Sequence, residues 1–138
     1  RDEGLLIYPE GTRFSPAKLA RALARLQQND PARFARYREV TQVLPLKKGG
    51  VLAMLDQAAH ADLVIAAHRG LTGFAELGDL WRGGFVGARA EVCLWRIPRG
   101  EIPDEPEERM AFLDRAWQEV ERFASGAKLA PPGSGGDE

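Results

Sequence analysis

Residues 9–13 carry side chains whose types and spacing suit the binding of an anion. They read Pro-Glu-Gly-Thr-Arg, so a carboxylate, a glycine, a hydroxyl and a guanidinium fall within four consecutive positions. The guanidinium of Arg13 offers a planar fork that pairs bidentately with a phosphate group, and Gly11 allows the backbone to approach an oxyanion closely. The hydroxyl of Thr12 can donate a further hydrogen bond. The pattern predicts a phosphate-binding loop.

Glu10 has two possible roles in this loop. Its carboxylate would repel a phosphate group if it pointed inward, so we expect it to orient Arg13 or a substrate hydroxyl instead. The alternative is that Glu10 and Arg13 pair only with each other and staple the loop. The residues alone leave both possibilities open.

Two further basic clusters are candidates for contact with anions. Lys47 and Lys48 precede Gly49-Gly50 at the start of an expected helix, where the positive helix terminus favours a phosphate, although a solvated loop explains them equally well. Arg33, Arg36 and Arg38 could contact anionic headgroups, but Asp30 and Glu39 dilute their charge. We expect this second cluster to be a solvated helix face.

The remaining reactive side chains give no pattern that indicates catalysis or metal binding. His60 is interpreted as a surface residue, and His68 as a structural residue or a pocket residue at a strand end. Cys93 is the only cysteine, which excludes an internal disulfide and a cysteine-based metal site. We expect no metal and no cofactor.

The composition is that of a globular domain without affinity for nucleic acid. The 138 residues carry 19 Lys+Arg against 20 Asp+Glu, a formal charge of -1, so any recognition of phosphate must be local. No run approaches the roughly 18 to 20 apolar residues of a membrane-spanning helix. We therefore expect no transmembrane segment. The single cysteine, Cys93, fits a reducing compartment, so we expect a position on the cytoplasmic side.

The elements around the phosphate-binding loop are expected to alternate between strands and helices. Apolar runs at 5–8, 43–46 and 63–67 predict buried strands, and the alternation over 88–97 predicts a half-buried strand. Helices are expected over 16–28, over 31–40, after Lys47-Lys48, and over 106–124; residues 72–81 are weakly helical, with Phe74, Leu77 and Trp81 on one face that suits either the core or a membrane interface.

This order predicts an α/β fold with a layered, mainly parallel sheet flanked by helices. The loop at 9–13 would then lie at the carboxyl end of a strand, where such sheets bind ligands. We expect residues 1–124 to form one domain and residues 125–138, rich in Gly, Pro and Ser, to form a disordered tail. Because the chain starts at Arg1 and contains no methionine before Met54, we expect it to be part of a longer protein.

Residues 8–13 closely resemble the Phe-Pro-Glu-Gly-Thr-Arg block of the lysophosphatidic acid acyltransferase superfamily, with Tyr8 in place of Phe. Residues 15–20, Leu44-Pro45 and residues 48–50 also resemble the lysocardiolipin and related acylglycerophosphate acyltransferases. The resemblance extends over about residues 5–123. It covers the C-terminal part of the family's domain, so it implies a glycerolipid acyltransferase-like fold whose N-terminal portion is missing.

The resemblance assigns roles to two groups of residues. It implies that Glu10, Gly11, Thr12 and Arg13 bind the phosphate of the acceptor lipid. It also implies that the strand at 63–67 lines the acyl or acceptor pocket through Val64, Ile65 and Ala66, although the proline common in that strand of the family is absent here.

The catalytic signature of the family, His-x4-Asp, does not occur in this chain. The residue five positions after His60 is Ile65, and the residue five positions after His68 is Gly73. In the family, histidine deprotonates the acceptor hydroxyl and aspartate orients the imidazole. We therefore expect this chain to supply no catalytic residue and to be inactive alone.

The resemblance implies a function for the parent protein in phospholipid biosynthesis. The parent protein would transfer an acyl group from acyl-CoA or acyl-ACP to a lysophospholipid. The acceptor favoured by the resemblance is 1-acylglycerol-3-phosphate, and the product is then phosphatidic acid. The parent would meet the cytoplasmic face of the membrane peripherally. The alternative is a non-catalytic phosphate- or phospholipid-binding module, or an inactive fragment.

Overall fold

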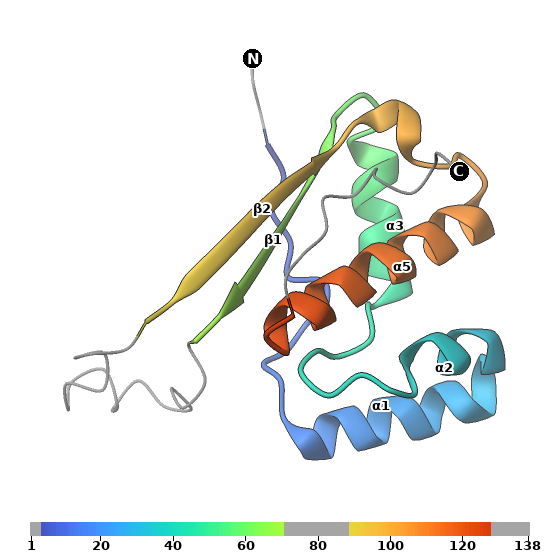
Figure 1. The fold of residues 1–138 in the computed structure, drawn as a ribbon. Helices are drawn as coiled ribbons and strands as arrows, with labels where there is room; N and C mark the ends of the chain where they lie inside the picture. Colours follow the sequence, from blue (N-terminus) through green and yellow to red (C-terminus); the bar gives the residue numbers. More distant parts are fainter. Residues whose placement is uncertain (1–3, 71–88, 128–138) are drawn as a thin grey trace, which may run out of the picture.

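The computed structural model of the protein describes residues 4–70 and 89–127 (Figure 1). In chain order, these residues form the helices and strands α1 (Pro16–Asn29), α2 (Pro31–Tyr37), α3 (Lys48–Gln57), β1 (Leu63–Arg69), β2 (Glu91–Ile97), the 3-10 helix η1 (Arg99–Glu101) and α5 (Pro106–Ala124).

The strands β1 and β2 pair as an antiparallel sheet, with a register that runs from Leu63 opposite Ile97 to Arg69 opposite Glu91. Within the described ranges this is the whole of the sheet. The prediction of a layered, mainly parallel sheet flanked by helices is therefore wrong: the described part of the chain is helical around one two-stranded antiparallel sheet.

Two of the expected strands are irregular segments, and this accounts for the error. Residues 43–46 are buried, but two of their carbonyl groups bind side chains: Trp117 Nε1 donates to the carbonyl of Leu44 at 3.0 Å, and Arg33 Nη2 donates to that of Leu46 at 2.9 Å. Residues 5–8 also form no strand, and Leu6 is 79% exposed. An apolar run therefore neither guarantees that a segment is buried nor specifies which groups bind its backbone.

The predictions for the helices are confirmed, with one shorter than expected. Ser15 caps α1 by accepting a hydrogen bond from the Lys18 amide at 3.3 Å, and Pro16 follows at the first helical position. The helix α5 spans the predicted residues. The helix α2 ends at Tyr37 and not at Val40, whose amide closes a turn onto the Tyr37 carbonyl at 3.1 Å.

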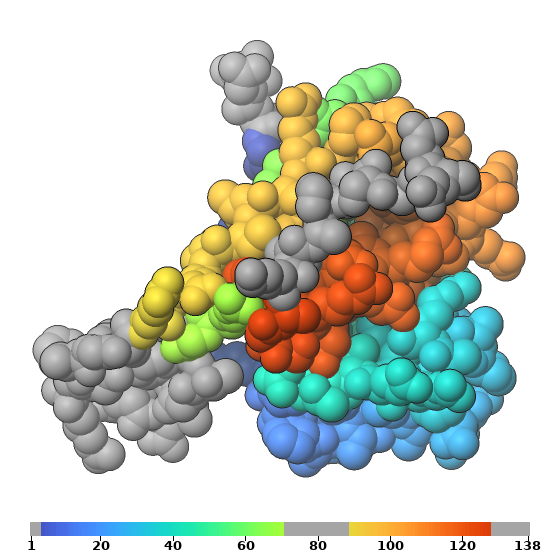
Figure 2. Space-filling model, in the orientation of Figure 1, coloured from blue at the N-terminus to red at the C-terminus, as the bar shows by residue number. Residues whose placement is uncertain are grey.

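The helix α5 is the central element of the fold. It contacts β1, α2 and α3, while α1 packs against α2. Figure 2 shows α5 between the hairpin on one side and the α1–α2 pair on the other. The apolar face of α5 supplies Met110, Leu113, Val120 and Phe123 to the core, which also takes side chains from every other helix and strand named above except η1.

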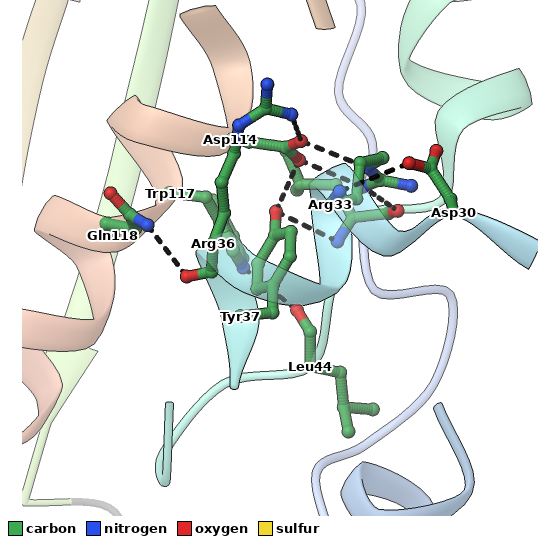
Figure 3. A network of polar contacts seen from close by, with 9 residues as sticks. Asp30, Arg33, Arg36, Tyr37, Leu44, Asp114, Trp117 and Gln118 are labelled. Carbon is green, nitrogen blue, oxygen red and sulfur yellow. Dashed lines mark hydrogen bonds and ion pairs between the residues drawn. The ribbon is translucent and has the colours of Figure 1, made fainter. Parts of the chain in front are cut away.

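A buried polar network fastens α2 to α5 (Figure 3). Asp114 is fully buried and accepts hydrogen bonds from Arg33 Nε and Nη2, both at 2.9 Å, and from the Tyr37 hydroxyl at 2.7 Å. Arg36 Nη1 lies 3.3 Å from the same carboxylate. The expectation that Arg33, Arg36 and Arg38 form a solvated helix face is therefore wrong for Arg33, which pairs within the core.

Some predictions fall on residues that the structure does not describe. These are the weak helix at 72–81 with Phe74, Leu77 and Trp81, and the tail beyond residue 127. Among the helices of residues 4–70 and 89–127, none combines the length and apolar character that crossing a membrane requires.

Candidate functional site

The predicted phosphate-binding loop is built on a tight turn. The amide of Gly11 donates to the carbonyl of Tyr8 at 2.9 Å, which closes a β-turn with Pro9 in its second position. Gly11 itself has a φ of +68°, in the left-handed region that other residues rarely adopt. The conformation of the turn therefore requires a glycine at this position.

The loop is fixed on one side to the start of α3. The Lys47 amide donates to the Pro9 carbonyl at 2.9 Å. The Lys47 side chain then lies across Gly11, because a Cβ added at Gly11 would be 2.6 Å from Lys47 Nζ and 2.8 Å from its Cδ and Cε. The absence of a side chain at Gly11 thus allows an ammonium group to approach the loop backbone.

On the other side, the loop is fixed to the first turn of α1. Lys18 Nζ donates to the Thr12 hydroxyl oxygen at 2.8 Å and to the Arg13 carbonyl at 3.0 Å. Lys18 was not among the residues predicted to bind a ligand. A signal was available, since side chains of a helix lean toward its N-terminus, and Lys18 follows the N-cap by three residues.

The four predicted loop residues differ in their environment. Gly11, Thr12 and Arg13 are exposed, whereas Glu10 is half-buried. Burial raises the pKa of Glu10 to about 7; a hydrogen bond from the Leu44 backbone opposes this shift and the charge of Glu121 adds to it. Glu10 thus lies on the inner side of the loop, toward Leu44 and α5.

The first turn of α3 adds a second source of positive potential beside the loop. Its N-cap residue, Lys47, gives the helix no side-chain cap, and the first turn contains no acidic residue. Gly49 and Gly50 have open space where a side chain would be. Amide groups at such a helix terminus carry a partial positive charge and attract anions.

The segment between α2 and α3 supports the inner side of the loop, and the buried network holds it there. Trp117 and Arg33 bind the carbonyl groups of Leu44 and Leu46, and the Tyr37 hydroxyl lies 3.5 Å from the Leu46 amide. Since Leu44 contacts Glu10 and Lys47 follows Leu46 directly, the network around Asp114 positions the loop indirectly.

An open apolar hollow begins immediately after the loop. It has a volume of about 330 Å³ and lies along α1, lined by Phe14, Pro16, Leu19, Ala20, Leu23 and Thr41. Because Phe14 follows Arg13 in the chain, the hollow and the loop are neighbours. A polar loop beside an apolar surface is an arrangement that suits an amphiphilic molecule.

The three residues expected to line a pocket do not share one face of β1. Val64 and Ala66 point to the exposed face of the hairpin, and Ile65 is buried in the core. Successive side chains of a strand alternate in this way. A pocket role therefore stays a prediction for Val64 and Ala66, and Ile65 could affect such a pocket only from the core side.

Both histidines lie on the surface of the protein. His60 follows α3 in a turn, and His68 lies on the exposed face of β1 opposite Val92. In residues 4–70 and 89–127, no group of His, Cys, Asp and Glu side chains has an arrangement suited to a metal ion.

Comparisons of the chain with models of protein families, with curated proteins and with solved structures found no match. The interpretation of the site therefore depends on its geometry and on the resemblance of residues 8–13 to the acyltransferase block.

Proposed function

We propose that residues 10–13 bind the phosphate group of a lysophospholipid, as the acceptor-binding part of an acyltransferase. The acceptor in this proposal is 1-acylglycerol-3-phosphate, and the acyl donor is acyl-CoA or acyl-ACP. The observation that carries the proposal is the convergence of two ammonium groups, from Lys18 and Lys47, on the exposed backbone around Gly11 and Thr12.

The electrostatics of the loop support an anionic ligand. Lys18 lies on α1 and Lys47 is the N-cap residue of α3, and the two side chains reach opposite ends of residues 11–13, where Arg13 adds a third positive charge. The uncapped first turn of α3 adds its dipole. The nearby carboxylate of Glu10 lies on the inner side of the loop, so its position leaves the outer side to the cationic groups.

The apolar hollow supports a ligand that carries a hydrocarbon chain as well as a phosphate. It starts at Phe14, next to Arg13, and its lining is almost entirely apolar. A free sugar phosphate would gain nothing from this surface, whereas a lysophospholipid would bury part of its acyl chain there. This favours an amphiphilic acceptor over a small polar phosphate.

Acyl transfer in this proposal needs a base that the chain does not contain. Neither His60 nor His68 is followed by the aspartate of a His-x4-Asp pair. The general base that removes the proton from the acceptor hydroxyl would therefore come from another part of the parent protein. In this proposal residues 10–13 bind the substrate, and another part of the parent protein carries out the proton transfer.

The second candidate function is a non-catalytic phosphate- or phospholipid-binding module, which the lack of this base favours. The coding sequence upstream of Arg1 separates the two. A His-x4-Asp signature there supports the acyltransferase, and an upstream sequence without it supports the binding module. Both functions use the same phosphate site.

The phosphate site is tested by titrating the chain into glycerol 3-phosphate and following the phosphorus NMR signal of the ligand. We expect saturable binding that becomes about tenfold weaker in Arg13→Ala, the effect of losing one charge-assisted phosphate contact. The control is Arg38→Ala, which removes the same charge from an exposed position in contact with Glu39. Equal affinity in Arg13→Ala and wild type would refute the role of Arg13.

A further inference from the structure

The helix α1 carries a local concentration of positive charge. Between Glu10 and Asp30 the chain contains four basic residues and no acidic one. Three of the four, Lys18, Arg21 and Arg25, lie on α1. They are three or four positions apart, so they form one row along the helix, the basic row. Since the whole chain has a formal charge of -1, this row stands out from the average surface.

The charges of the two arginines are available to a partner. Both side chains are exposed, and Arg21 Nε donates only to a backbone carbonyl of its own helix, that of Ala17, at 3.3 Å. In the part of the chain that the structure describes, neither Arg21 nor Arg25 pairs with a carboxylate. By contrast, Arg89 before β2 and Arg122 on α5 each lie beside a glutamate, at 3.6 and 3.1 Å.

A row of exposed alanines separates the basic row from the apolar hollow. Ala17, Ala20 and Ala24 are also three or four positions apart, so they form the neighbouring row of the helix, the alanine row. Ala20 lines the hollow as well. Figure 1 shows α1 at the edge of the molecule, packed against α2. Around the outside of α1, the basic row is therefore followed by the alanine row and then by the hollow.

We propose that the basic row and the alanine row of α1 form a docking surface for a membrane that contains anionic lipids. The arginines would lie among the lipid phosphate groups, and the hollow would open beside the bilayer. This inference rests on the proposed lipid ligand and adds the surface through which the protein approaches it. In this orientation the hydrocarbon chain of an acceptor enters the hollow from the bilayer without crossing water.

The neighbouring apolar surface favours a membrane over other polyanions. A nucleic acid would use the basic row but would gain nothing from the alanine row or from the hollow. A helix that lies in the plane of a membrane interface presents basic residues to the headgroups and apolar residues to the acyl chains. Because alanine side chains bury little area, the contact of α1 is mainly electrostatic, and binding should weaken as salt is added.

The first experiment measures co-sedimentation of the full 138-residue chain with vesicles at low ionic strength. The vesicles contain phosphatidylcholine alone or with about one third phosphatidylglycerol, and we expect binding to require the anionic lipid. Each basic residue near an anionic surface contributes about fivefold, so the double variant Arg21→Gln/Arg25→Gln should bind about 25-fold more weakly. The control, Arg89→Gln/Arg122→Gln, removes the same charge from exposed positions elsewhere and should bind like the wild type.

The second experiment asks whether the alanine row reaches the lipid. A tryptophan is introduced by Ala24→Trp, with Ala53→Trp at an exposed position of α3 as the control. Phosphatidylglycerol vesicles with brominated acyl chains quench the fluorescence of a tryptophan that they contact. We expect quenching beyond that of the wild type in Ala24→Trp and not in Ala53→Trp. Circular dichroism of each variant first confirms that the helices are intact.

Four outcomes would overturn the docking surface: equal binding to the two kinds of vesicle, unchanged binding by the Arg21→Gln/Arg25→Gln variant, no additional quenching in Ala24→Trp, and binding to polyuridylate that is as tight and depends on the same arginines. The glycerol 3-phosphate titration tests the phosphate site separately. Binding of glycerol 3-phosphate without binding to vesicles refutes the docking surface alone. Vesicle binding through α1 without binding of glycerol 3-phosphate refutes the phosphate site alone.

Discussion

Replacing Asp114 tests how much the buried network stabilises the fold, including the segment between α2 and α3 that supports the loop. Its carboxylate is fully buried and accepts two hydrogen bonds from Arg33 and one from the Tyr37 hydroxyl. Asp114→Ala leaves the guanidinium of Arg33, 7% exposed, without its counter-charge. Breaking a buried pair in this way costs about 3 to 5 kcal/mol. A domain typically has only about 5 to 15 kcal/mol of stability, so the loss is large.

The assay is urea unfolding followed by tryptophan fluorescence, since Trp117 contacts the same segment through the Leu44 carbonyl. We expect Asp114→Ala to unfold at much lower urea than the wild type. The control is Glu39→Ala, whose carboxylate is exposed and pairs only loosely with Arg38 at 3.6 Å. This variant should unfold at the wild-type midpoint.

A triple variant separates two effects of Asp114→Ala on stability: the unpaired charge that it leaves on Arg33, and the loss of packing. Replacing Arg33 by Met, Tyr37 by Phe and Asp114 by Leu removes the three buried members of the network and leaves an apolar core of similar volume. Arg36 loses its contact with Asp114, but its side chain is partly exposed and can be solvated. Such replacements are often neutral, and the Leu46 carbonyl that loses its donor costs about 1 to 3 kcal/mol. The triple variant should be more stable than Asp114→Ala. If it is not, or if Asp114→Ala loses less than about 1 kcal/mol, the reasoning is wrong.

Two further predictions concern the loop itself. The folded state raises the pKa of Glu10 from 4.5 to about 7, so it binds this proton more tightly than the unfolded state. The stability from Glu10 is therefore full below pH 4.5 and is lost as the pH rises to about 7. Allowing for solvent screening of a half-buried group, the free energy of unfolding should fall by about 1 to 2 kcal/mol between pH 5 and pH 8. Glu10→Gln should remove this pH dependence, which is measured as the difference between the urea midpoints at the two pH values. Gly11→Ala should cost about 1 to 2 kcal/mol in the same assay, from the φ of +68° and the contact with Lys47, whereas Gly49→Ala, with open space at its Cβ, should be neutral or stabilising. A Gly11→Ala midpoint equal to that of the wild type would contradict the turn geometry.

The helices could be predicted from the sequence because their signals are local. Ser15-Pro16 marks the start of α1, and the apolar stripe of α5 recurs at intervals of three and four residues. Both depend on contacts within one or two turns. Local signals of this kind need no knowledge of the rest of the fold.

The sheet could not be predicted because strand pairing is a long-range property. The apolar runs at 5–8 and 43–46 match the pattern of buried strands, yet the carbonyl groups of the second run bind the side chains of Trp117 and Arg33. Those partners lie on α5 and α2, and no pattern within four residues reveals them. The antiparallel pairing of β1 with β2 could not be predicted from local patterns either, since it joins segments that are separated by residues 70–90.

The geometry of the loop at residues 9–13 could be predicted in part. The turn at Gly11 and the exposure of Thr12 and Arg13 follow from the types of residues 9–13. The position of Glu10, which faces Leu44 and α5 rather than solvent, could not be predicted in this way, because it depends on Leu44 and Glu121. Lys18 was overlooked because its contact with Thr12 crosses from a helix to the preceding loop.

A phosphate site at residues 10–13, flanked by Lys18 and Lys47, can be detected by mapping amide chemical shifts. The chain is labelled with nitrogen-15 and titrated with glycerol 3-phosphate. We expect saturable shifts concentrated at the amides of Gly11, Thr12 and Arg13 and at the first turn of α3, and half-saturation at about tenfold higher ligand concentration in Arg13→Ala. Shifts that are absent from these amides, or that saturate at the same ligand concentration in Arg13→Ala as in the wild type, would contradict the phosphate site.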